Sequence, residues 1–450
     1  MPHPLLPGAT APQLTRRTVL GGLAASALAV AGCSSGGDAP ASAPAATSTQ
    51  VVGRTELAVY AWTNGPTIDD NFKKRVALFN QEFSGKYTAK INFLPYDQYW
   101  QKIQLQYAAK KPFDIYFWDV QAYAHYKKGL IFNEQTAVDG TPMVDQATYP
   151  TALYDPWRFD GKNLFCVPDS LQTMMLYYNK DHFDEAGLDY PDATWTWDKV
   201  VETAPMLQKS SGGKVTRWGL DIGALGIWWG LQSLAWAAGT AFVDKALEPA
   251  AFQMTDPKVV EALRYVQDLM WSKHVAPRPE ERAAVSQNNG GFASGAFSMI
   301  PDGSWSIASY QQMKANWAVA PLPSYQGQSV APYWMGGWVI PKDSGALSAA
   351  QTFALWSATT FQKTMATNHD WIPLENAART SDEMLQGMPD GFSEAMTNLP
   401  KARIGDFYTT NMQQIFNEVF GTNVDLLLNN KLTPEAAAQK MQDAATKLLA

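Results

Sequence analysis

The chain has 450 residues, of which 46% are hydrophobic and 17% are charged, and this length predicts two or three units that share large cores. Two cysteines exclude a small disulfide-stabilised scaffold, while 35 basic and 42 acidic residues give a formal net charge of -7 without the basic stripe that nucleic acid requires. Tryptophan, with 17 copies, is nearly as frequent as tyrosine (18) and phenylalanine (20). A core of this size does not need so many indoles, so we expect some of them to contact a ligand.

The first 32 residues have the composition of an export signal. They contain no acidic residue, and Arg16-Arg17 precedes an uncharged run of small and apolar residues from Gly21 to Gly32. This run is shorter than the about 20 residues that a membrane-spanning helix needs. The paired arginines resemble a twin-arginine signal, and Val30-Ala31-Gly32-Cys33 resembles a lipobox, in which the cysteine is lipidated and becomes the first mature residue. An unmodified cysteine in a plain secretory signal is the alternative.

Residues 33–53 are predicted to be the lipidated cysteine and a flexible tether, because Ser, Gly, Ala and Pro dominate this segment. We therefore expect the folded body to begin near Arg54. If Cys33 carries a lipid, Cys166 has no disulfide partner within the chain. Cys166 is predicted to be a small buried residue without a catalytic role.

Strand and helix patterns alternate after the tether. In chain order they predict a strand over 56–62, a helix carrying Phe72 to Phe83, a strand over 91–94, a helix over 96–110, a strand over 113–118 and a helix that ends at Gly129. Three strand and helix units in series predict a largely parallel sheet with helices on both faces. Two later helices have start signals, at Asp256-Pro257 and at Thr433-Pro434.

Aromatic, carboxylate and amide side chains follow the three predicted strands. In open sheets of this kind, ligands bind beyond the carboxyl ends of the strands. A sugar ring has apolar faces and an edge of hydroxyl groups, so this mixture of side chains predicts a carbohydrate site. The candidates after the strands are Trp62, Asn64, Asp97, Asp119 and Gln121, and the same mixture recurs in residues 168–173, 227–230, 301–305 and 333–338.

The tryptophans divide into three groups by their surroundings in the sequence. Six lie in apolar periodic stretches and are predicted to be core residues: Trp118, Trp218, Trp236, Trp271, Trp317 and Trp356. Trp195 and Trp197 flank a helix start and are expected to pack locally. Six adjoin glycines or turn residues, so the sequence is equally consistent with a position in a cleft and a position in the core: Trp62, Trp228, Trp229, Trp305, Trp334 and Trp338. For Trp305, the preceding Pro301-Asp302-Gly303-Ser304 is a turn sequence that predicts presentation from a loop.

The order of these motifs resembles the extracellular solute-binding proteins of bacterial sugar ABC importers, family 1 type, from about Arg54 to Ala450. The residues that carry the resemblance are Trp62-Thr63-Asn64-Gly65, Leu78-Phe79-Asn80, residues 113–118, Gly129-Leu130, residues 161–168, residues 176–181, residues 194–197, residues 292–299 with Gly303-Ser304-Trp305, and residues 336–342. The resemblance implies an α/β fold of the type II periplasmic-binding-protein class, with a ligand cleft between two lobes. It implies a first lobe of residues 54–171 plus 326–366 and a second of residues 172–325 plus 367–450.

The resemblance also assigns ligand-binding roles. Trp62, Asn64, Asp119 and Gln121 belong to the first lobe, and the first crossing between lobes supplies Ser170 and Gln172. Family members often have a carboxylate where this chain has Gln172, so a strong hydroxyl acceptor is either missing here or replaced by Asp169. Second-lobe and closing segments add Trp228, Trp229, Asp302, Trp305, Gly336, Gly337, Trp338, Trp371, Arg379 and Tyr408.

An enzyme is the competing hypothesis. Glycoside hydrolysis uses two carboxylates, and Asp97, Asp119 and Asp302 are available. The sequence has no Gly-x-Ser-x-Gly, no His-Glu-x-x-His and no phosphate-binding loop, and its five histidines lack metal-ligand spacing. We expect a binding protein without enzymatic activity, cofactor or metal. A carbohydrate-active lipoprotein enzyme and a sugar sensor on the same fold are the alternatives.

The expected partners follow from this reading. We expect a monomer that is lipid-anchored on the outer face of the cell membrane, binds a carbohydrate and works with the permease subunits of an ABC transporter. Whether the ligand is a mono-, di- or oligosaccharide, a polyol or a sugar phosphate stays open. A phosphate is disfavoured, because the candidate segments contain no basic residue apart from Arg379.

Overall fold

The computed structural model describes residues 53–63, 65–117, 122–132, 157–161, 164–286, 291–369, 371–397 and 399–449. The predicted export signal with Cys33, the tether, and the candidate residues Asn64, Asp119 and Gln121 lie outside these ranges. The elements below belong to one compact unit, Val51–Ala450.

The strands join into one sheet. Along its main path the order is β2 (Thr88–Leu94), β1 (Glu56–Trp62), β3 (Ile115–Phe117), β9 (Pro332–Val339), β4 (Val167–Asn179), β7 (Phe297–Gly303), β6 (Lys214–Leu220) and β5 (Lys209–Ser211). β10 (Ile372–Pro373) and β8 (Trp317–Ala320) pair with β4, and β11 (Arg403–Ile404) pairs with β9.

The first elements match the sequence prediction. β1 pairs in parallel with β2 and β3, and between them lie α1 (Pro66–Glu82) and α2 (Tyr96–Ala108). The apolar residues predicted to form one helical face, from Phe72 to Phe79, are buried in α1. Phe83 is the C-cap of this helix, and the cap amide donates to the carbonyl of Phe79. The helix predicted to end at Gly129 is α3 (Tyr123–Lys127).

The prediction of a largely parallel sheet is wrong for its centre. β9 runs antiparallel to β3 and β4, and β7 and β8 run antiparallel to β4. These pairings join segments more than a hundred residues apart, which the order of local strand and helix units cannot reveal. The predicted turn at Pro301-Asp302-Gly303 is also wrong, because β7 continues through Gly303 and a short 3₁₀ helix, η5 (Ser304–Ser306), begins only after it.

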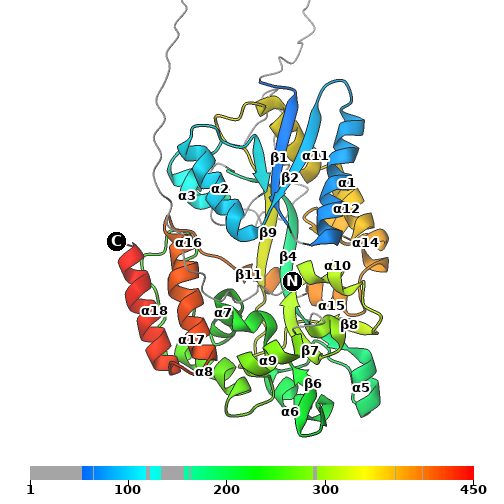
Figure 1. The fold of residues 1–450 in the computed structure, drawn as a ribbon, viewed down its shortest axis with the longest axis vertical. Coiled ribbons are helices and arrows are strands. Elements are labelled where there is room, and N and C mark those ends of the chain that lie inside the picture. Colours follow the sequence, from blue (N-terminus) through cyan, green and yellow to red (C-terminus); the bar gives the residue numbers. More distant parts are fainter. Residues whose placement is uncertain are drawn as a thin grey trace, which may run out of the picture. The chain divides into compact units, whose positions relative to one another are not determined.

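β4 connects two groups of strands. All 13 of its residues are buried. Residues Val167 to Thr173 pair with β9, beside which β4 runs in Figure 1, whereas Met174 to Asn179 pair with β7 and β8. The strand therefore changes partners between Thr173 and Met174, within a few residues of the predicted crossing between lobes.

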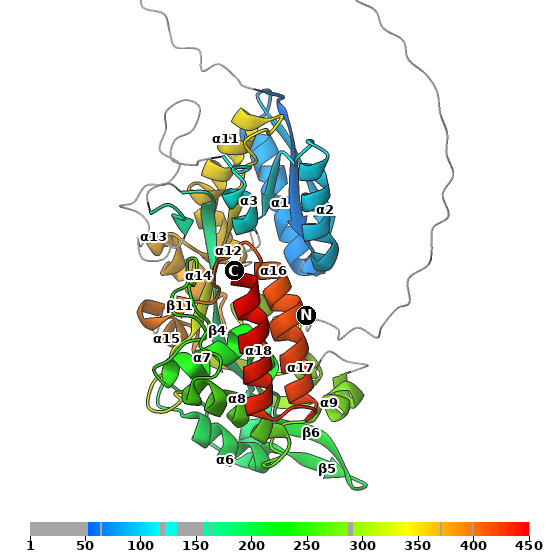
Figure 2. The same ribbon diagram turned by 90° about the vertical axis from the view of Figure 1, so that its left-hand side faces the viewer.

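Helices cover the remaining segments. They are α5 (Lys180–Ala186), α6 (Trp197–Leu207), η3 (Gly223–Gly226), α7 (Trp228–Ala237), α8 (Pro257–Met270), α9 (Pro279–Ser286), η4 (Gly291–Ser294), α10 (Ile307–Tyr310), α11 (Leu347–Ala358), α12 (Phe361–Asn368), α13 (Asn376–Arg379), α14 (Asp382–Gln386), α15 (Phe392–Thr397), η6 (Leu399–Lys401), α16 (Met412–Gln414), the π-helix η7 (Ile415–Gly421), α17 (Thr422–Leu428) and α18 (Pro434–Leu449). Figure 2 shows α17 and α18 side by side.

The two predicted helix starts are confirmed by their caps. The Asp256 carboxylate accepts from the amide of Lys258 at 2.8 Å at the start of α8, and the Thr433 hydroxyl accepts from the amide of Ala436 at 3.2 Å at the start of α18. Such caps satisfy amides that have no partner within the helix.

Two apolar clusters hold the sheet and helices together. The smaller one joins β1 and α1 to α11 and includes Val59, Phe79 and Phe353, while the larger one surrounds the second half of β4. Cys166 is fully buried, as expected, and forms no disulfide among the described residues. Among the described residues, no helix combines the length and apolar character that crossing a membrane would demand.

Candidate ligand-binding site

Three indole rings form an aromatic cluster, the tryptophan cluster, made of Trp229, Trp305 and Trp334. Trp229 comes from the first turn of α7, Trp305 from η5 and Trp334 from β9. The ring centroids lie 5.7 Å apart for Trp229 and Trp305, 5.0 Å for Trp229 and Trp334, and 5.4 Å for Trp305 and Trp334. All three pairs are edge to face, and each residue is only half-buried. The cluster therefore leaves part of its aromatic surface open to a ligand.

Two glycines make room for these rings. A Cβ at Gly303 would lie 2.3 Å from ring atoms of Trp305, and a Cβ at Gly405 would lie 2.2 Å from the ring of Trp334. The carbonyl of Gly405 accepts from Nε2 of Gln232, one turn after Trp229 on α7, at 3.3 Å. Glycine is required at both positions because the indole ring lies too close to the backbone for a Cβ atom, and not because the backbone has a positive φ.

Gln172 and Ser170 on β4 lie beside the cluster. In the antiparallel register, Gln172 is opposite Trp334 and Ser170 is opposite Gly336, so each pair projects from the same face of the sheet. Gln172 is 4% exposed and Ser170 is 1% exposed. Within the described part of the chain, Nε2 of Gln172 and Oγ of Ser170 have no hydrogen-bond partner. Buried polar groups are nearly always satisfied, so these two atoms are candidates for hydrogen bonds to a ligand.

A second aromatic group lies at the other side of Ser170. A Cβ at Gly336 would lie 2.3 Å from Oγ of Ser170, 2.6 Å from the Phe117 ring and 3.1 Å from the Trp371 ring. The Phe117 centroid is 5.2 Å from that of Trp371 and 5.0 Å from that of Trp62. Trp62 is half-buried and the other two rings are buried. This face of β4 and β9 thus carries buried polar groups without hydrogen-bond partners among the described residues, and two sets of aromatic rings lie near them.

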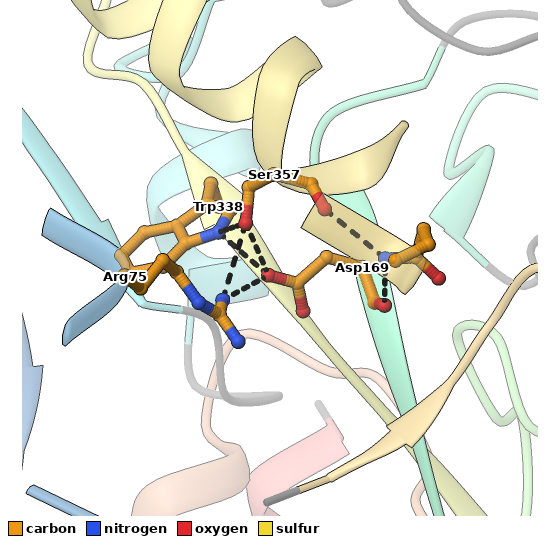
Figure 3. A network of polar contacts seen from close by, with 5 residues as sticks. Arg75, Asp169, Trp338 and Ser357 are labelled. Carbon is orange, nitrogen blue, oxygen red and sulfur yellow. Dashed lines mark hydrogen bonds and ion pairs between the residues drawn. The ribbon is translucent and has the colours of Figure 1, made fainter. Parts of the chain in front are cut away.

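A buried ion pair fixes β4 where it reaches this face (Figure 3). Oδ2 of Asp169 accepts from Nη1 of Arg75 at 2.6 Å, from Nε1 of Trp338 at 2.8 Å and from the Ser357 hydroxyl at 2.9 Å. Its carbonyl accepts from Nε2 of Gln362 at 2.7 Å. Arg75 is 2% exposed and Asp169 is fully buried. Asp169 therefore ties β4 to α1, β9, α11 and α12 through Oδ2 and its carbonyl. Its Oδ1 is buried without a hydrogen-bond partner among the described residues, so its predicted use as a hydroxyl acceptor for ligand stays a prediction.

Asp302 also has a structural role. Its Oδ2 accepts from the Ser306 hydroxyl at 2.7 Å and from the Tyr310 hydroxyl at 2.9 Å, and its Oδ1 accepts from the amide of Gly303 at 2.7 Å. Burial raises the pKa of Asp302. These bonds fix η5, which carries Trp305, so Asp302 positions a candidate residue and does not itself offer a free carboxylate.

The guanidinium of Arg379 hydrogen-bonds to two backbone carbonyls and to one neighbouring side chain. Its Nη1 donates to the carbonyl of Leu374 at 2.7 Å and to that of Pro373 at 3.3 Å, and its Nη2 donates to the Asn376 side chain. Burial lowers the pKa of Arg379. The guanidinium holds the loop after β10, which contradicts its predicted contact with ligand.

Two of the predicted indoles are core residues. Trp228 is 6% exposed, and its centroid is 4.0 Å from that of Phe416 and 5.8 Å from that of Phe407. Trp338 is fully buried against Phe353, with a centroid distance of 5.0 Å, and its Nε1 donates to Asp169. Neighbouring helices cover both rings, so neither offers a face to a ligand.

Tyr408 and Gly337 are corrected for the same reason. Tyr408 is 1% exposed, and its hydroxyl accepts from Nε1 of Trp157 at 3.2 Å. A Cβ at Gly337 would lie 2.4 Å from the carbonyl oxygen of Val167, so protein atoms already fill the space above it. Asp97 is the second residue of α2, and its side chain lies outside what the structure describes.

The structure thus brings together Trp62, Ser170, Gln172, Trp229, Trp305, Gly336 and Trp371 from the predicted set, and it adds Trp334. Trp334 and Trp338 are four residues apart on β9, so they project from the same face. The strand pattern could not separate them, because only the helices that cover Trp338 make the difference. In the described ranges, no three His, Cys, Asp or Glu side chains gather in a way that could hold a metal ion.

Comparison with known proteins gives the site a context. The family model for bacterial extracellular solute-binding proteins matches residues 74–387. A maltodextrin-binding protein of Bacillus subtilis (strain 168) is 29% identical over 194 residues, which are 41% of this chain and 43% of that protein. An arabinooligosaccharide-binding protein of Halalkalibacterium halodurans is 22% identical over 424 residues, which are 87% of this chain and 89% of that protein.

A solved structure has the same fold. An ABC substrate-binding protein of Listeria monocytogenes, in complex with cycloalternan, superposes with a TM-score of 0.78 at 21% identity and covers 88% of this chain and 99% of that chain. The expected fold, α/β of the periplasmic-binding-protein class, is confirmed by this likeness.

Proposed function

We propose that this chain, which belongs to the family of bacterial extracellular solute-binding proteins, captures a carbohydrate outside the cell and delivers it to the permease of an ABC transporter. The observation that carries the proposal is the half-buried tryptophan cluster next to Ser170 and Gln172, whose buried polar atoms have no hydrogen-bond partner among the described residues. Two relatives are named for maltodextrin and arabinooligosaccharide, and the structural neighbour holds cycloalternan, which supports a saccharide ligand, while other relatives are named for sn-glycerol 3-phosphate.

The chemistry of the site suits a sugar. Indole faces pack against the apolar C–H faces of a pyranose or furanose ring, and the amide of Gln172 and the hydroxyl of Ser170 hydrogen-bond to its polar edge. Trp62 and Trp371 would contact a further ring of the same ligand, because they lie on the other side of Ser170. Two aromatic groups separated by polar atoms favour an oligosaccharide over a single sugar ring.

The proposal includes two lobes that close on the ligand. The first comprises residues 54–171 plus 326–366 and the second comprises residues 172–325 plus 367–450. The change of partners along β4, between Thr173 and Met174, supports a crossing at this place. Each lobe holds part of the contacts, so the closed form makes all of them and ligand binding shifts the equilibrium towards it.

The proposal also places the protein at the membrane. Export removes the first 32 residues, Cys33 carries the lipid, and residues 34–53 form the tether that keeps the body near the permease. We expect a monomer that binds its ligand without a metal or cofactor and without altering it.

A thermal-shift screen of the purified unit from Val51 onward tests this function. The probes are maltotriose, arabinotriose, mannobiose and glycerol 3-phosphate. A ligand at about 100 times its Kd stabilises a protein by about 2.7 kcal/mol, so the binding sugar raises Tm by several degrees. Chromatography of the recovered ligand then shows the intact sugar. Cleaved products would favour the carbohydrate-active enzyme, and a response to glycerol 3-phosphate alone would contradict a carbohydrate ligand.

A further inference from the structure

A pocket of about 240 Å³, the basic pocket, lies at the C-terminal end of α7. Its lining includes Gln232 and Trp236 from α7, Lys245 from the loop after α7, and Arg403 from β11. Pockets for drug-sized ligands have about 300–1,000 Å³, so this one suits a single group of a larger ligand. Arg403 and Lys245 give it a basic character that the tryptophan cluster lacks.

The helix α7 joins the basic pocket to the tryptophan cluster. Trp236 comes seven residues, or nearly two helical turns, after Trp229, so both indoles project from the same side of α7. Gln232 lies between them on this side and is 2% exposed. Its Nε2 donates to the carbonyl of Gly405 at 3.3 Å, which ties α7 to the segment that carries Arg403.

The strand pairing places Arg403 on the face that carries the cluster. β11 runs parallel to β9, and Arg403 is opposite Pro332 in the register. Trp334 lies two residues further along β9, so it projects from the same face as Pro332 and Arg403. Gly405 likewise lies two residues after Arg403, and a Cβ there would meet the Trp334 ring. The basic pocket is therefore a neighbour of the aromatic site on both elements.

The guanidinium of Arg403 has no counter-charge. Its Cζ lies 5.1 Å from the ring centroid of Trp236, which is 6% exposed. Among the described residues, Arg403 forms neither an ion pair nor a side-chain hydrogen bond. A guanidinium that stacks on an indole keeps its N–H edge free, and this edge fits two oxygens of a carboxylate or phosphate group.

The acidic side chains of the basic pocket do not neutralise Arg403. They are Asp244 and Asp406, and neither forms an ion pair with Arg403 in the part of the chain that the structure describes. Oδ1 of Asp244 accepts from two backbone amides of its own loop, at 2.9 and 3.1 Å. Lys245, on the same loop, is exposed and adds a second positive charge. The pocket thus offers its cations to a ligand.

We propose that Arg403 is a specificity-determining residue that binds an anionic group of the saccharide, either the carboxylate of a uronic acid or the phosphate of a sugar phosphate. This inference rests on the proposed function and deepens it, because it names an acidic saccharide as the ligand. Among the segments nominated from the sequence, Arg379 was the basic residue, and its guanidinium bonds to the protein. Arg403 supplies the basic group that those segments lack.

Isothermal titration of the full chain with matched pairs of probes tests this inference. Digalacturonate is compared with the neutral galactobiose of the same linkage, and trehalose 6-phosphate is compared with trehalose. We expect the acidic member of one pair to bind at least about tenfold more tightly than its neutral partner, and that pair identifies the anionic group. The preference should shrink as NaCl is raised from about 0.05 to 0.5 M, because salt screens the charge on Arg403.

Substitution of Arg403 assigns the preference to this side chain. Arg403→Gln should bring the affinity for the acidic probe down to that for the neutral one, which should not change. Arg403→Lys keeps the charge without the planar fork and should retain part of the preference. Arg264→Gln is the control, because it removes the same charge from an exposed arginine of α8 that pairs with Glu435, and the preference should persist. If Arg403→Gln does not fold, Arg403→Lys and the salt series decide.

The outcomes are distinct. A wild-type chain that binds neutral sugars as tightly as acidic ones, or neutral sugars alone, would overturn the inference and leave the proposed function intact. Equal losses for both members of a pair in Arg403→Gln would also contradict it, since they would show that Arg403 only supports the packing of Trp236. A wild-type chain that binds none of these probes, nor any sugar of the wider screen, would refute the proposed function and this inference with it.

Discussion

The surroundings of an indole ring decide whether it recognises a ligand or fills a core. Trp305 is half-buried and touches Trp229 and Trp334 edge to face. We expect Trp305→Ala to weaken sugar binding by roughly 5- to 150-fold, since the lost contact is worth on the order of 1–3 kcal/mol. Titration with the bound sugar measures this loss, and Tm of the ligand-free protein should change little.

Trp228→Ala is the matched control for this prediction. Trp228 lies in the core against Phe416, so its truncation should lower the free energy of unfolding by about 3–5 kcal/mol. A Trp305→Ala variant that behaves in this way, with a large fall in Tm and unchanged affinity, would show that Trp305 is a packing residue.

The sequence could nominate site residues by chemistry but could not say which of them are covered. Trp229, Trp305, Ser170 and Gln172 were predicted from residue type and family order, and the structure brings them to one face. Trp338 has the same glycine-rich surroundings as Trp334, yet α1 and α11 bury it. Burial of this kind depends on helices distant in the sequence, so the local pattern contains no signal for it.

Among the elements, β4 depends on a single buried carboxylate. Asp169 is fully buried and bonds to Arg75 at 2.6 Å. We expect Asp169→Asn to reduce the free energy of unfolding in urea by about 3–5 kcal/mol, because the guanidinium of Arg75 then stays buried without a counter-charge. Sugar affinity should fall as well, since Ser170 follows Asp169 directly.

Asp70→Asn is the control for the ion pair. Asp70 bonds to Lys73 at 2.7 Å, a similar distance, but both side chains are more than half exposed. Solvent screens such a pair, so the urea midpoint should not move. Equal effects of the two substitutions would contradict the view that the Asp169 pair fixes β4.

The contact between α3 and β3 gives the fold a dependence on pH. His125 is 4% exposed, and its Nδ1 lies 3.3 Å from the Tyr116 hydroxyl. Burial, with a smaller effect of Lys128, lowers the pKa of His125 to about 4. The unfolded chain has a pKa of about 6.5 at this residue, so it binds the proton more readily. The free energy of unfolding should therefore be constant above pH 6.5 and fall as the pH is lowered towards 4.

Urea denaturation at several pH values checks this sign. His125→Gln should reduce the slope between pH 6.5 and 4 but not abolish it, because burial also lowers the pKa of His182 to about 4. An unchanged slope in the variant would show that His125 is not protonated on unfolding in this range.

Local elements were easier to predict than their pairing. The alternation in residues 56–62 and the caps of α8 and α18 are properties of a few neighbouring residues, and the structure confirms them. The antiparallel pairing of β4 with β9 places Gln172 opposite Trp334. The sequence near either residue does not indicate that the other is its partner. The candidate site is built on this pairing, so its chemistry could be predicted while its geometry could not.

At the scale of the whole molecule, the proposed lobes also meet through polar contacts at the surface. The Tyr123 hydroxyl donates to Oε1 of Glu248 at 2.8 Å, Lys127 pairs with the same carboxylate, and Nε2 of Gln104 donates to Oε1 of Gln413 at 3.0 Å. Exposed polar contacts contribute little and exchange readily with water. Breaking these contacts would therefore cost little if the proposed lobes moved, whereas the buried bond from Trp157 to Tyr408 and the continuous backbone of β4 hold the two groups of residues together.

The last prediction concerns the thiol that would hold the whole molecule at the membrane. The chain has two cysteines, and Cys166 is fully buried, so a lipid-transferring enzyme could not reach its sulfur without unfolding the protein. Cys33→Ala should abolish labelling by palmitate in cells and release the protein from the membrane fraction, whereas Cys166→Ala should keep both. Label that persists in Cys33→Ala, or protein that stays in the membrane fraction after a high-salt wash, would refute the lipid anchor, because the lipobox offers the modification no other sulfur.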